Sequence, residues 1–292
     1  MYNATNFRPP QNYACMEKPR EKTAVPSSLY DEAYFRTACE GYDEFNASEG
    51  VQLSRRLSSA FSHAQVKPGM KVLDVGCGRG EILRHAAALG ADAWGIDYAT
   101  VAVNMSQRVI EGVDGVMPGR MSVAQADAKH LPYPTASFDR VLMFDVVEHL
   151  YPWELNAALR EVHRVLKPDG VFIVHTAPNV WYDRYAYPVV RAFRRALGQG
   201  AAYPKNPRNF LVAVNEHVHV NEQSMLSMWN VLRNAGFTGR VWLESPPQPP
   251  PSGLLGRLRE FVFRTPPFRW FFEREVFAVA TKTVQVETAP HA

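Results

Sequence analysis

Cysteine is scarce in this sequence, and long apolar segments are missing. The three cysteines, Cys15, Cys39 and Cys77, lie too far apart in 292 residues for a disulfide framework or a zinc cluster. Residues 1–22 lack the apolar core of a secretory signal. No window reaches the roughly 18 uninterrupted apolar residues that a membrane span requires. We therefore expect a cytoplasmic protein with reduced thiols.

A large excess of one charge is also missing. The chain has 32 Lys and Arg residues against 29 Asp and Glu residues. The resulting net charge of +3 is too small to predict nucleic-acid binding, and the sequence contains no recognisable nucleic-acid-binding module. Hydrophobic residues make up 46% of the chain and charged residues 21%. This composition is typical of a globular protein and excludes wholesale disorder.

The chain divides into an arm, one domain and a short tail. Residues 1–28 are polar and aperiodic, so we expect a flexible N-terminal arm. Residues 29–284 carry the periodic patterns of an ordered domain, and residues 285–292 are expected to be a disordered tail. This length can bury a full hydrophobic core.

Strands and helices alternate from Lys71 onward. The alternation predicts βαβ units and a mostly parallel sheet. Upstream, the spacing between Val51 and Ala64 predicts a helix that buries Val51, Leu57 and Phe61. The expected strands are KVLDV, AWGID, SVAQAD, DRVLMFDVV, VFIVHT, GRVWLE and EVFAVATK.

A glycine-rich turn follows the first expected strand. Residues 72–80 read VLDVGCGRG, with Gly76, Gly78 and Gly80 between the strand and the next helix. Glycine is needed where a ligand approaches the backbone closely, because a side chain would block it. Dinucleotide-binding oxidoreductases have a similar turn, so the turn alone does not identify the ligand.

Acidic residues around the turn favour a cationic ligand. Asp74 lies inside the strand, and Glu81 follows the last glycine. Both carboxylates would face the pyrophosphate of a nicotinamide cofactor, which is unfavourable. S-adenosylmethionine has no phosphate and carries a sulfonium and an ammonium group. The two acids therefore favour this methyl donor over the cofactor of a nicotinamide-dependent oxidoreductase.

Several motifs, in order, resemble those of class I S-adenosylmethionine-dependent methyltransferases. VLDVGCGRGEILRHAAALG resembles their first motif and WGIDYA their second. QADAKHLPYPTASFDRVLMFDVVEHL resembles the third and fourth, and LREVHRVLKPDGVFIVHTAPN the stretch that follows. The likeness is nearest to the ubiquinone-biosynthesis and small-molecule group. It implies an α/β fold with a Rossmann-like, seven-stranded sheet, helices on both faces, and a lid from N-terminal and inserted segments.

The resemblance also implies S-adenosylmethionine as the cofactor and assigns residues to it by position. The glycines would line the methionine part, and Asp97 would accept hydrogen bonds from both ribose hydroxyls, as one carboxylate can. Cys77 is expected to fill space in the loop and not to act as a nucleophile. The expected cofactor-binding residues are Asp74, Gly76, Cys77, Gly78, Gly80, Asp97, Tyr98, Asp127, Ala128, Phe144 and Asp145.

A hydroxyl acceptor must lose a proton, and histidine is the most frequent base near neutral pH. His149 lies at the edge of the expected pocket, where a structural role is an equal alternative. His217 and His219 would point to one side if NEHVHVNE is extended. His175 fits the core somewhat better than the site. The expected catalytic residues are His149, His217 and His219, and the expected acceptor-binding residues are Tyr182 and Tyr185.

Metal-assisted methylation of a vicinal hydroxyl pair is an alternative. Asp145, Glu148 and His149 are similar to an arrangement in metal-dependent 2′-O-methyltransferases of small RNA and some catechol-type ubiquinone enzymes. With His217 or His219 added, these ligand types can bind Mg²⁺, Mn²⁺ or Zn²⁺. However, Asp145 stands where Glu is usual, and Glu-His pairs also occur in metal-free relatives. A site without metal is the leading expectation.

Two segments, residues 179–214 and 245–272, interrupt the alternation and are expected to form a substrate lid. The first contains six basic residues and one acidic residue, and the second contains four and one. Basic and aromatic side chains together fit an anionic acceptor or peripheral contact with an anionic membrane. A packed lid whose arginines are solvated explains these basic and aromatic side chains equally well.

The leading hypothesis is therefore O-methylation of a small-molecule or glycan acceptor, free or linked to a carrier, with no nucleic-acid partner. A non-catalytic protein that binds the cofactor or a membrane surface is the other alternative.

Overall fold

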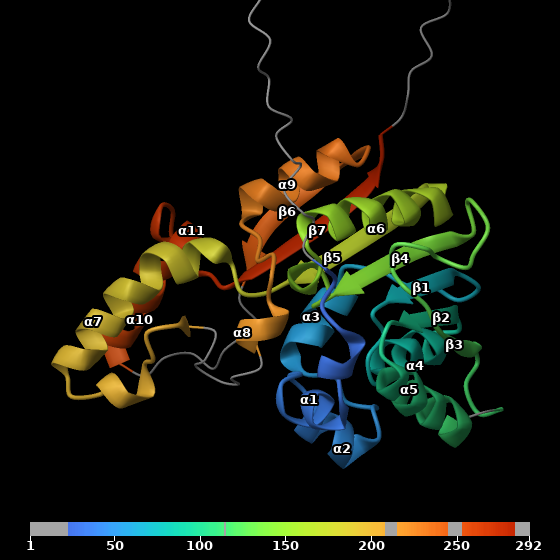
Figure 1. Ribbon diagram of the computed structural model, residues 1–292, viewed down its shortest axis with the longest axis horizontal. Coiled ribbons are helices and arrows are strands. Elements are labelled where there is room, and N and C mark those ends of the chain that lie inside the picture. The colour runs from blue at the N-terminus through green and yellow to red at the C-terminus, as the bar shows by residue number, and fades with distance from the viewer. Residues whose placement is uncertain (1–22, 114, 208–214, 245–252, 284–292) are drawn as a thin grey trace, which may run out of the picture.

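The computed structural model describes residues 23–113, 115–207, 215–244 and 253–283. Within these ranges, seven strands form one sheet in the order β3-β2-β1-β4-β5-β7-β6 (Figure 1). Strands β1 to β5 pair in parallel, and β7 pairs antiparallel with both β5 and β6. The expected Rossmann-like, mostly parallel sheet is confirmed. The strands are Lys71–Val75 (β1), Asp92–Asp97 (β2), Met121–Gln125 (β3), Phe138–Phe144 (β4), Leu166–Thr176 (β5), Phe237–Glu244 (β6) and Glu275–Lys282 (β7).

Side chains that alternate along the strands divide the core between the two faces of the sheet. On β1, Leu73 and Val75 pack on one face, and Val72 packs on the other. α6 and α9 cover the first face, α3 and α4 cover the second, and α5 packs on α4, β2 and β3. Helices thus cover both faces, as expected. Their bounds are Arg55–Ser62 (α3), Glu81–Ala88 (α4), Thr100–Val113 (α5), Pro152–Val165 (α6) and Met225–Asn234 (α9).

Local sequence signals explain where the helices begin. α4 starts directly after Gly80, whose φ of 88° lies in the left-handed region. Pro152 opens α6, and the Glu154 carboxylate accepts a hydrogen bond from the Tyr151 backbone amide at 3.1 Å. α6 ends at Val165, and β5 begins at Leu166, which already pairs with Phe138 of β4.

One expectation about the helix before β1 is wrong. The Ser54 hydroxyl accepts a hydrogen bond from the Leu57 amide and starts α3 at Arg55. Val51 therefore precedes the helix and is 55% exposed. Leu57 and Phe61 pack against the core, as the helical spacing predicts.

The segment before α3 is ordered from residue 23 and packs on the sheet domain. It contains Ser27–Leu29 (η1), Glu32–Thr37 (α1) and Tyr42–Ser48 (α2). Val25 and Phe35 are buried in a cluster with Ala102 of α5. Residues 23–28, which precede the expected domain boundary at residue 29, are thus part of this packed segment. The rest of the expected arm, residues 1–22, and the expected tail, residues 285–292, lie outside the described residues.

The two interruptions of the alternation form one lobe beside the sheet (Figure 1). We call this the α7–α11 lobe: Tyr182–Ala186 (η3, a π-helical turn), Tyr187–Ala196 (α7), Gly253–Arg264 (α10) and Phe268–Phe272 (α11). α11 contacts both η3 and α10. Residues 208–214 and 245–252 of the expected insertions are not described. In the described ranges, no helix is long and apolar enough to cross a bilayer.

Candidate functional site

A cavity of about 620 Å³ lies at the carboxyl ends of β1, β2 and β4. Ligands of open α/β sheets bind at this edge. The glycine-rich turn and residues 126–129 line one part of the cavity, and the segment from Ala24 to Glu40 lines another. Other parts of the wall include residues 144–150 after β4, together with Asp183, Pro207, His219 and residues 274–275.

The glycines of the turn are required by its geometry. Gly76 has a φ of 80°, and a Cβ atom there would collide with Cγ2 of Val146. A Cβ atom on Gly80 would lie 3.0 Å from Cα of Ser106. Cys77 is buried, with its Sγ 3.6 Å from Oγ of Ser106, and burial raises the pKa of its thiol. Its side chain therefore packs against α5, and Cys77 also lines the cavity.

Two carboxyl groups of the cavity wall have raised pKa values. The Asp97 carboxylate accepts hydrogen bonds from the backbone amides of Gly78, at 3.0 Å, and Ala99, at 2.9 Å. Burial raises its pKa to about 6. Burial, followed by the charges of Asp97 and Glu81, raises the pKa of Asp74 to about 8. Both carboxyl groups would be stabilised in their ionised forms by a cationic ligand or by hydrogen-bond donors.

Glu81 has a different role from the expected one. Its Oε1 atom accepts hydrogen bonds from Arg79, at 3.0 Å from Nε and 2.7 Å from Nη2. The remaining guanidinium donors reach the backbone carbonyls of Phe35, at 2.9 Å, and Glu40, at 2.8 Å. Glu81 is therefore already neutralised. Arg79, which the sequence analysis did not single out, fastens the N-terminal segment to the turn.

The side of the cavity expected to hold adenine is also acidic. Asp127 accepts a hydrogen bond from the Lys129 amide at 2.9 Å, and its other carboxylate oxygen lies 2.9 Å from Lys129 Nζ. Lys129 Nζ also donates to buried Glu154 at 2.7 Å. Tyr98 and Ala128 line the same region, and Tyr98 is 42% exposed. Asp127 is thus oriented by a lysine that the motif did not predict.

Beyond Phe144, which lines the cavity, Asp145 joins a buried charged network. Its carboxylate lies 3.1 Å from Arg56 Nη2 and 2.8 Å from His175 Nδ1. His175 Nε2 lies 3.2 Å from the Glu275 carboxylate. Burial alone would raise the pKa of Asp145 and lower that of His175. The charges of Arg56 and His175 instead hold the pKa of Asp145 well below its usual range, and Asp145 and Glu275 raise that of His175 to about 9.

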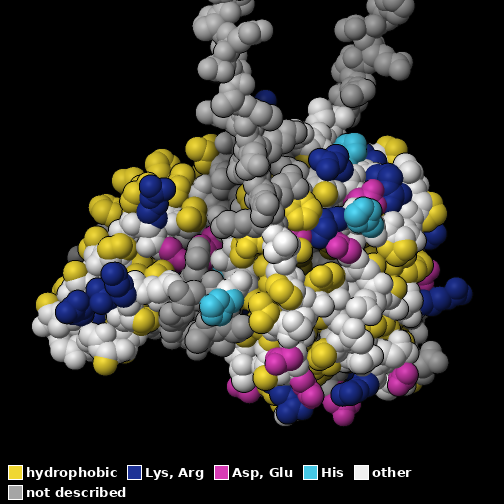
Figure 2. All heavy atoms as spheres, in the orientation of Figure 1, with side chains coloured by type: hydrophobic (Ala, Val, Ile, Leu, Met, Phe, Trp, Pro, Cys, Tyr) yellow, Lys and Arg dark blue, Asp and Glu magenta, His cyan; other side chains and the backbone are white. Residues whose placement is uncertain are grey.

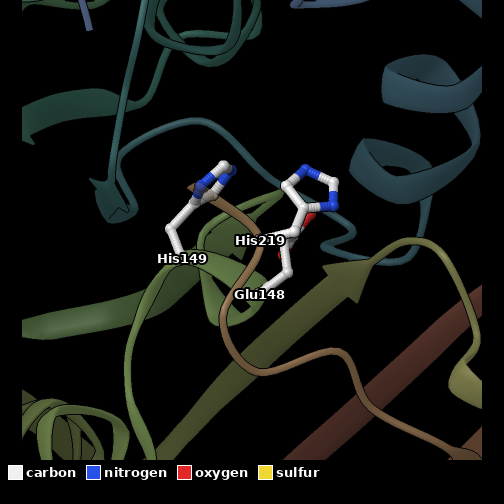
Figure 3. Close-up of side chains that lie close together, drawn as sticks. All are labelled: Glu148, His149 and His219. Atoms are coloured by element: carbon white, nitrogen blue, oxygen red, sulfur yellow. The ribbon is translucent and has the colours of Figure 1, made fainter. Parts of the chain in front are cut away.

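Glu148, His149 and His219 lie together at another part of the cavity (Figure 3). One possible ligand atom from each lies within 4.8 Å of the others. Glu148 and His149 belong to the turn Val147–His149 (η2) that follows β4, and His219 follows Asn215–Val218 (α8). The rings of His149 and His219 are nearly perpendicular, with centroids 5.0 Å apart.

The pKa values of Glu148 and His149 are shifted from their usual values. Burial, together with the neighbouring His219, lowers the pKa of His149 to about 3, so this imidazole is neutral. Burial and the charge of Asp145 raise the pKa of Glu148 to about 6. The Thr176 hydroxyl donates to Glu148 at 2.7 Å. His149 Nδ1 lies 3.2 Å from the Val218 carbonyl, which favours a proton on Nδ1 and leaves Nε2 as an acceptor.

His217 does not join this group. Residues 215–218 form the helix α8 where the sequence analysis expected an extended segment, so His217 and His219 do not share a face. His217 is exposed and is not part of the cavity wall. Asp145 is likewise not among the potential metal ligands, and its carboxylate is paired with Arg56 and His175 instead.

The expected acceptor-binding tyrosines lie outside the cavity wall. The Arg274 guanidinium lies 5.1 Å from the ring centre of Tyr182, and Tyr185 is 51% exposed. Two other tyrosines approach His149 instead: the hydroxyl of Tyr30 lies 3.3 Å from Nδ1, and that of Tyr34 lies 3.5 Å from Nε2. The tyrosine-rich composition around residues 30–45 was the only sequence signal for them.

Comparisons with known proteins agree with this architecture. A family model described as a methyltransferase domain matches residues 73–174. A ubiquinone/menaquinone biosynthesis C-methyltransferase from Cupriavidus pinatubonensis is 31% identical over 185 residues, which cover 58% of this chain and 72% of that protein. The chain therefore belongs to the class I S-adenosylmethionine-dependent methyltransferase superfamily.

Other relatives match a smaller part of their length. The cyclopropane-fatty-acyl-phospholipid synthase of Escherichia coli K12 is 27% identical over 164 residues, which cover 53% of this chain but only 40% of the synthase. This chain thus spans less than two thirds of some curated relatives. An S-adenosylmethionine-dependent methyltransferase structure from Mesorhizobium loti has a TM-score of 0.53, 17% identity and coverage of 78% of this chain and 97% of that chain. That likeness supports the fold alone.

Proposed function

We propose that this protein transfers a methyl group from S-adenosylmethionine to a small-molecule or glycan acceptor, with oxygen as the methylated atom. The observation that carries the proposal is a single cavity that joins the glycine-rich turn and Asp97 to Glu148 and His149. A donor held at the turn and an acceptor held beside His149 would share this cavity. Alignment of the two reactants can supply much of the rate enhancement of a direct displacement.

The residues of the turn fit S-adenosylmethionine better than a dinucleotide. Gly76 and Gly80 leave room for close approach to the backbone. Asp74 and Asp97 line the same region, while the one guanidinium of the turn, Arg79, is already paired with Glu81. When bound, S-adenosylmethionine supplies a methyl group on a positively charged sulfur. Acidic side chains suit that charge, whereas a pyrophosphate would meet no free cation of the turn.

The proton of an acceptor hydroxyl has a suitable destination in Glu148. Its pKa of about 6 is closer to neutral pH than the pKa of His149, which is about 3. We therefore assign proton acceptance to Glu148 and orientation of the acceptor to neutral His149. The hydroxyls of Tyr30 and Tyr34 lie beside His149 and would bind the acceptor from the N-terminal segment.

The N-terminal segment and the inserted segments would act as a lid, because Tyr30, Asp183 and Pro207 belong to the cavity wall. The wall is rich in carboxyl groups, whereas no described basic side chain of the two insertions belongs to it. This distribution supports a neutral acceptor or one whose anionic group stays outside the cavity. The relatives' names, a quinone C-methyltransferase and a phospholipid synthase, support a small-molecule or lipid-type acceptor.

Calorimetric titration with S-adenosylhomocysteine tests the cofactor assignment. We expect saturable binding to the wild type, at least about tenfold weaker binding to Asp97→Asn, and unchanged binding to Asp92→Asn. Asp92 is a matched control because it lies at the opposite end of the same strand, β2. Tight binding of NAD⁺, or no binding of S-adenosylhomocysteine to the wild type, would contradict the proposal.

Metal-assisted methylation is a second candidate, favoured by the grouping of Glu148, His149 and His219. A carboxylate and two imidazoles suit Mn²⁺ or Zn²⁺. Titration with Mn²⁺, followed by electron paramagnetic resonance, tests it. Binding should be lost in His219→Ala and kept in His217→Ala, since exposed His217 lies outside the group. No stoichiometric Mn²⁺ or Zn²⁺ binding to the wild type would exclude this candidate.

A further inference from the structure

A stripe of exposed apolar side chains runs along one side of η3 and α7. Tyr185, Val189, Phe193 and Leu197 recur at intervals of four residues and so share one helical face. They are 51%, 65%, 64% and 56% exposed, respectively. Tyr187 is buried instead, and its hydroxyl donates to the Pro204 carbonyl at 2.7 Å. The helix is thus anchored from another side and presents the stripe to the exterior.

Arginines surround this stripe without acidic partners. Arg184, Arg191, Arg194 and Arg195 form no ion pair with any described carboxylate, and α7 itself contains no acidic residue. None of the four belongs to the cavity wall. Arg184 and Arg195 are exposed, whereas Arg191 and Arg194 are half-buried and donate to the Tyr203 carbonyl, at 3.1 Å, and to the Gln199 side-chain oxygen, at 2.8 Å. The positive charge of the helix is thus not balanced by a carboxylate of the described residues and can interact with an anionic partner.

α10 and α11 add further exposed apolar side chains to the lobe. Leu254 and Phe261 of α10 are 83% and 68% exposed, and Phe268 and Trp270 of α11 are 49% and 41% exposed. Figure 2 shows hydrophobic side chains, interspersed with Lys and Arg, over the part of the molecule where Figure 1 labels α7 and α10. Large apolar areas of this kind mark interaction surfaces.

We propose that the α7–α11 lobe docks on the surface of an anionic lipid bilayer. An amphipathic helix with Phe and Leu on one face and Arg beside it binds at the interface, with apolar side chains among the lipids and guanidinium groups at the headgroups. A second copy of this chain fits less well. Two copies stacked through the stripe would bring Arg191, Arg194 and Arg195 of each close to the same charges of the other, whereas anionic headgroups complement them.

Docking here would place the cavity close to the bilayer. Asp183 belongs to the cavity wall, and Tyr185, two residues further along the same turn, begins the stripe. An acceptor on a lipid carrier would therefore have a short path from the headgroup layer to the lid. This last step rests on the proposed methyl transfer, whereas the docking itself does not.

Sedimentation with vesicles tests the docking directly. The full chain is mixed with vesicles of phosphatidylcholine alone or of phosphatidylcholine with phosphatidylglycerol. We expect binding to the anionic vesicles that is at least about tenfold tighter than to neutral vesicles and that weakens with added salt. The double substitution Val189→Ser and Phe193→Ser should weaken binding about tenfold or more. Reversal of charge by Arg194→Glu and Arg195→Glu should do the same.

A matched control lies on the body of the protein. Leu226 and Trp229 of α9 are 53% and 39% exposed, so Leu226→Ser with Trp229→Ser removes comparable apolar area outside the lobe. This variant should bind vesicles as the wild type does. Equal loss in this control, or absence of binding to anionic vesicles, would overturn the proposal. So would a dimer in sedimentation velocity that dissociates on Val189→Ser and Phe193→Ser.

Titration with S-adenosylhomocysteine separates this proposal from the proposed function. The stripe lies outside the cavity wall, so its variants should bind S-adenosylhomocysteine like the wild type. Vesicle binding without cofactor binding would remove the methyl transfer and leave the docking intact. Cofactor binding without vesicle binding would overturn the docking and leave the proposed methyl transfer intact.

Discussion

Arg79 and Glu81 form a buried ion pair that joins the glycine-rich turn to the N-terminal segment. The Arg79 side chain donates to the Glu81 carboxylate and to the carbonyls of Phe35 and Glu40. Both charged residues are almost fully buried. The N-terminal segment and the glycine-rich turn are therefore held together by one ion pair, so a change in either should affect the other.

Replacement of Arg79 should loosen the packing of the N-terminal segment on the turn. Arg79→Ala leaves buried Glu81 without its cation and removes the donors from two carbonyls. Loss of one partner of a buried ion pair costs about 3–5 kcal/mol. We expect a corresponding fall in unfolding free energy by urea titration and faster proteolysis within residues 23–48. Arg84→Ala, which removes only one hydrogen bond to the Glu49 carbonyl, should have a small effect. Similar effects of both substitutions would contradict this role.

The raised pKa of Asp97 predicts a pH-dependent affinity. A carboxylate that accepts hydrogen bonds from ribose hydroxyls must be ionised, and Asp97 ionises only as the pH rises through about 6. S-adenosylhomocysteine should therefore bind more tightly at about pH 7 than at about pH 5, by up to about tenfold per pH unit below the pKa. Calorimetry with Asp97→Asn should show a smaller rise over this range. The remaining rise would report Asp74, whose pKa is about 8.

Gly76 and Gly69 offer a matched pair of substitutions. Both have φ near 80°, but no atom lies within 4 Å of a Cβ on Gly69, whereas a Cβ on Gly76 would collide with Val146. Gly69→Ala should cost about 1–2 kcal/mol of unfolding free energy from backbone strain alone. Gly76→Ala should cost about 1–3 kcal/mol more and weaken cofactor binding. Val146→Ala in the Gly76→Ala background should restore part of the loss.

His175 should make stability fall at alkaline pH. Its pKa of about 9 in the folded protein lies above the usual value near 6.5, so the folded state binds its proton more tightly. This contribution is complete below pH ~6.5 and is lost as the pH rises through 9, on the order of 3 kcal/mol in total. His175→Gln should flatten the urea-unfolding profile over this window. A profile unaltered by His175→Gln would contradict the assignment.

The sequence predicts the sheet well because its signals are local. Alternation of apolar runs with helical spacing marks the strands, and VLDVGCGRG marks the turn before α4. Parallel strand order then brings Asp74, Asp97 and Phe144 to one edge, where the cavity lies. Short-range patterns thus locate the end of the cavity that we propose for the cofactor.

The other end of the cavity, around His149, depends on contacts between segments that are distant in the sequence. Tyr30 and His149 are 119 residues apart, and the pairing of His175 with Glu275 spans 100 residues. A local pattern does not encode such distances, so these partners were missed. The helical turn at His217 was missed for a related reason: NEHVHVNE alternates like a strand, but residues 215–218 form α8.

The wall of the cavity is built from two groups of segments that could be changed separately. Residues 74–129 supply one end, whereas the N-terminal segment, the η2 turn, the inserted segments and the stretch around His219 supply the other. If the proposed function holds, grafting of the N-terminal and inserted segments from a related enzyme should change the acceptor preference and leave cofactor binding unchanged. The two ends of the cavity thus come from different segments of the chain, although the described strands form one continuous sheet.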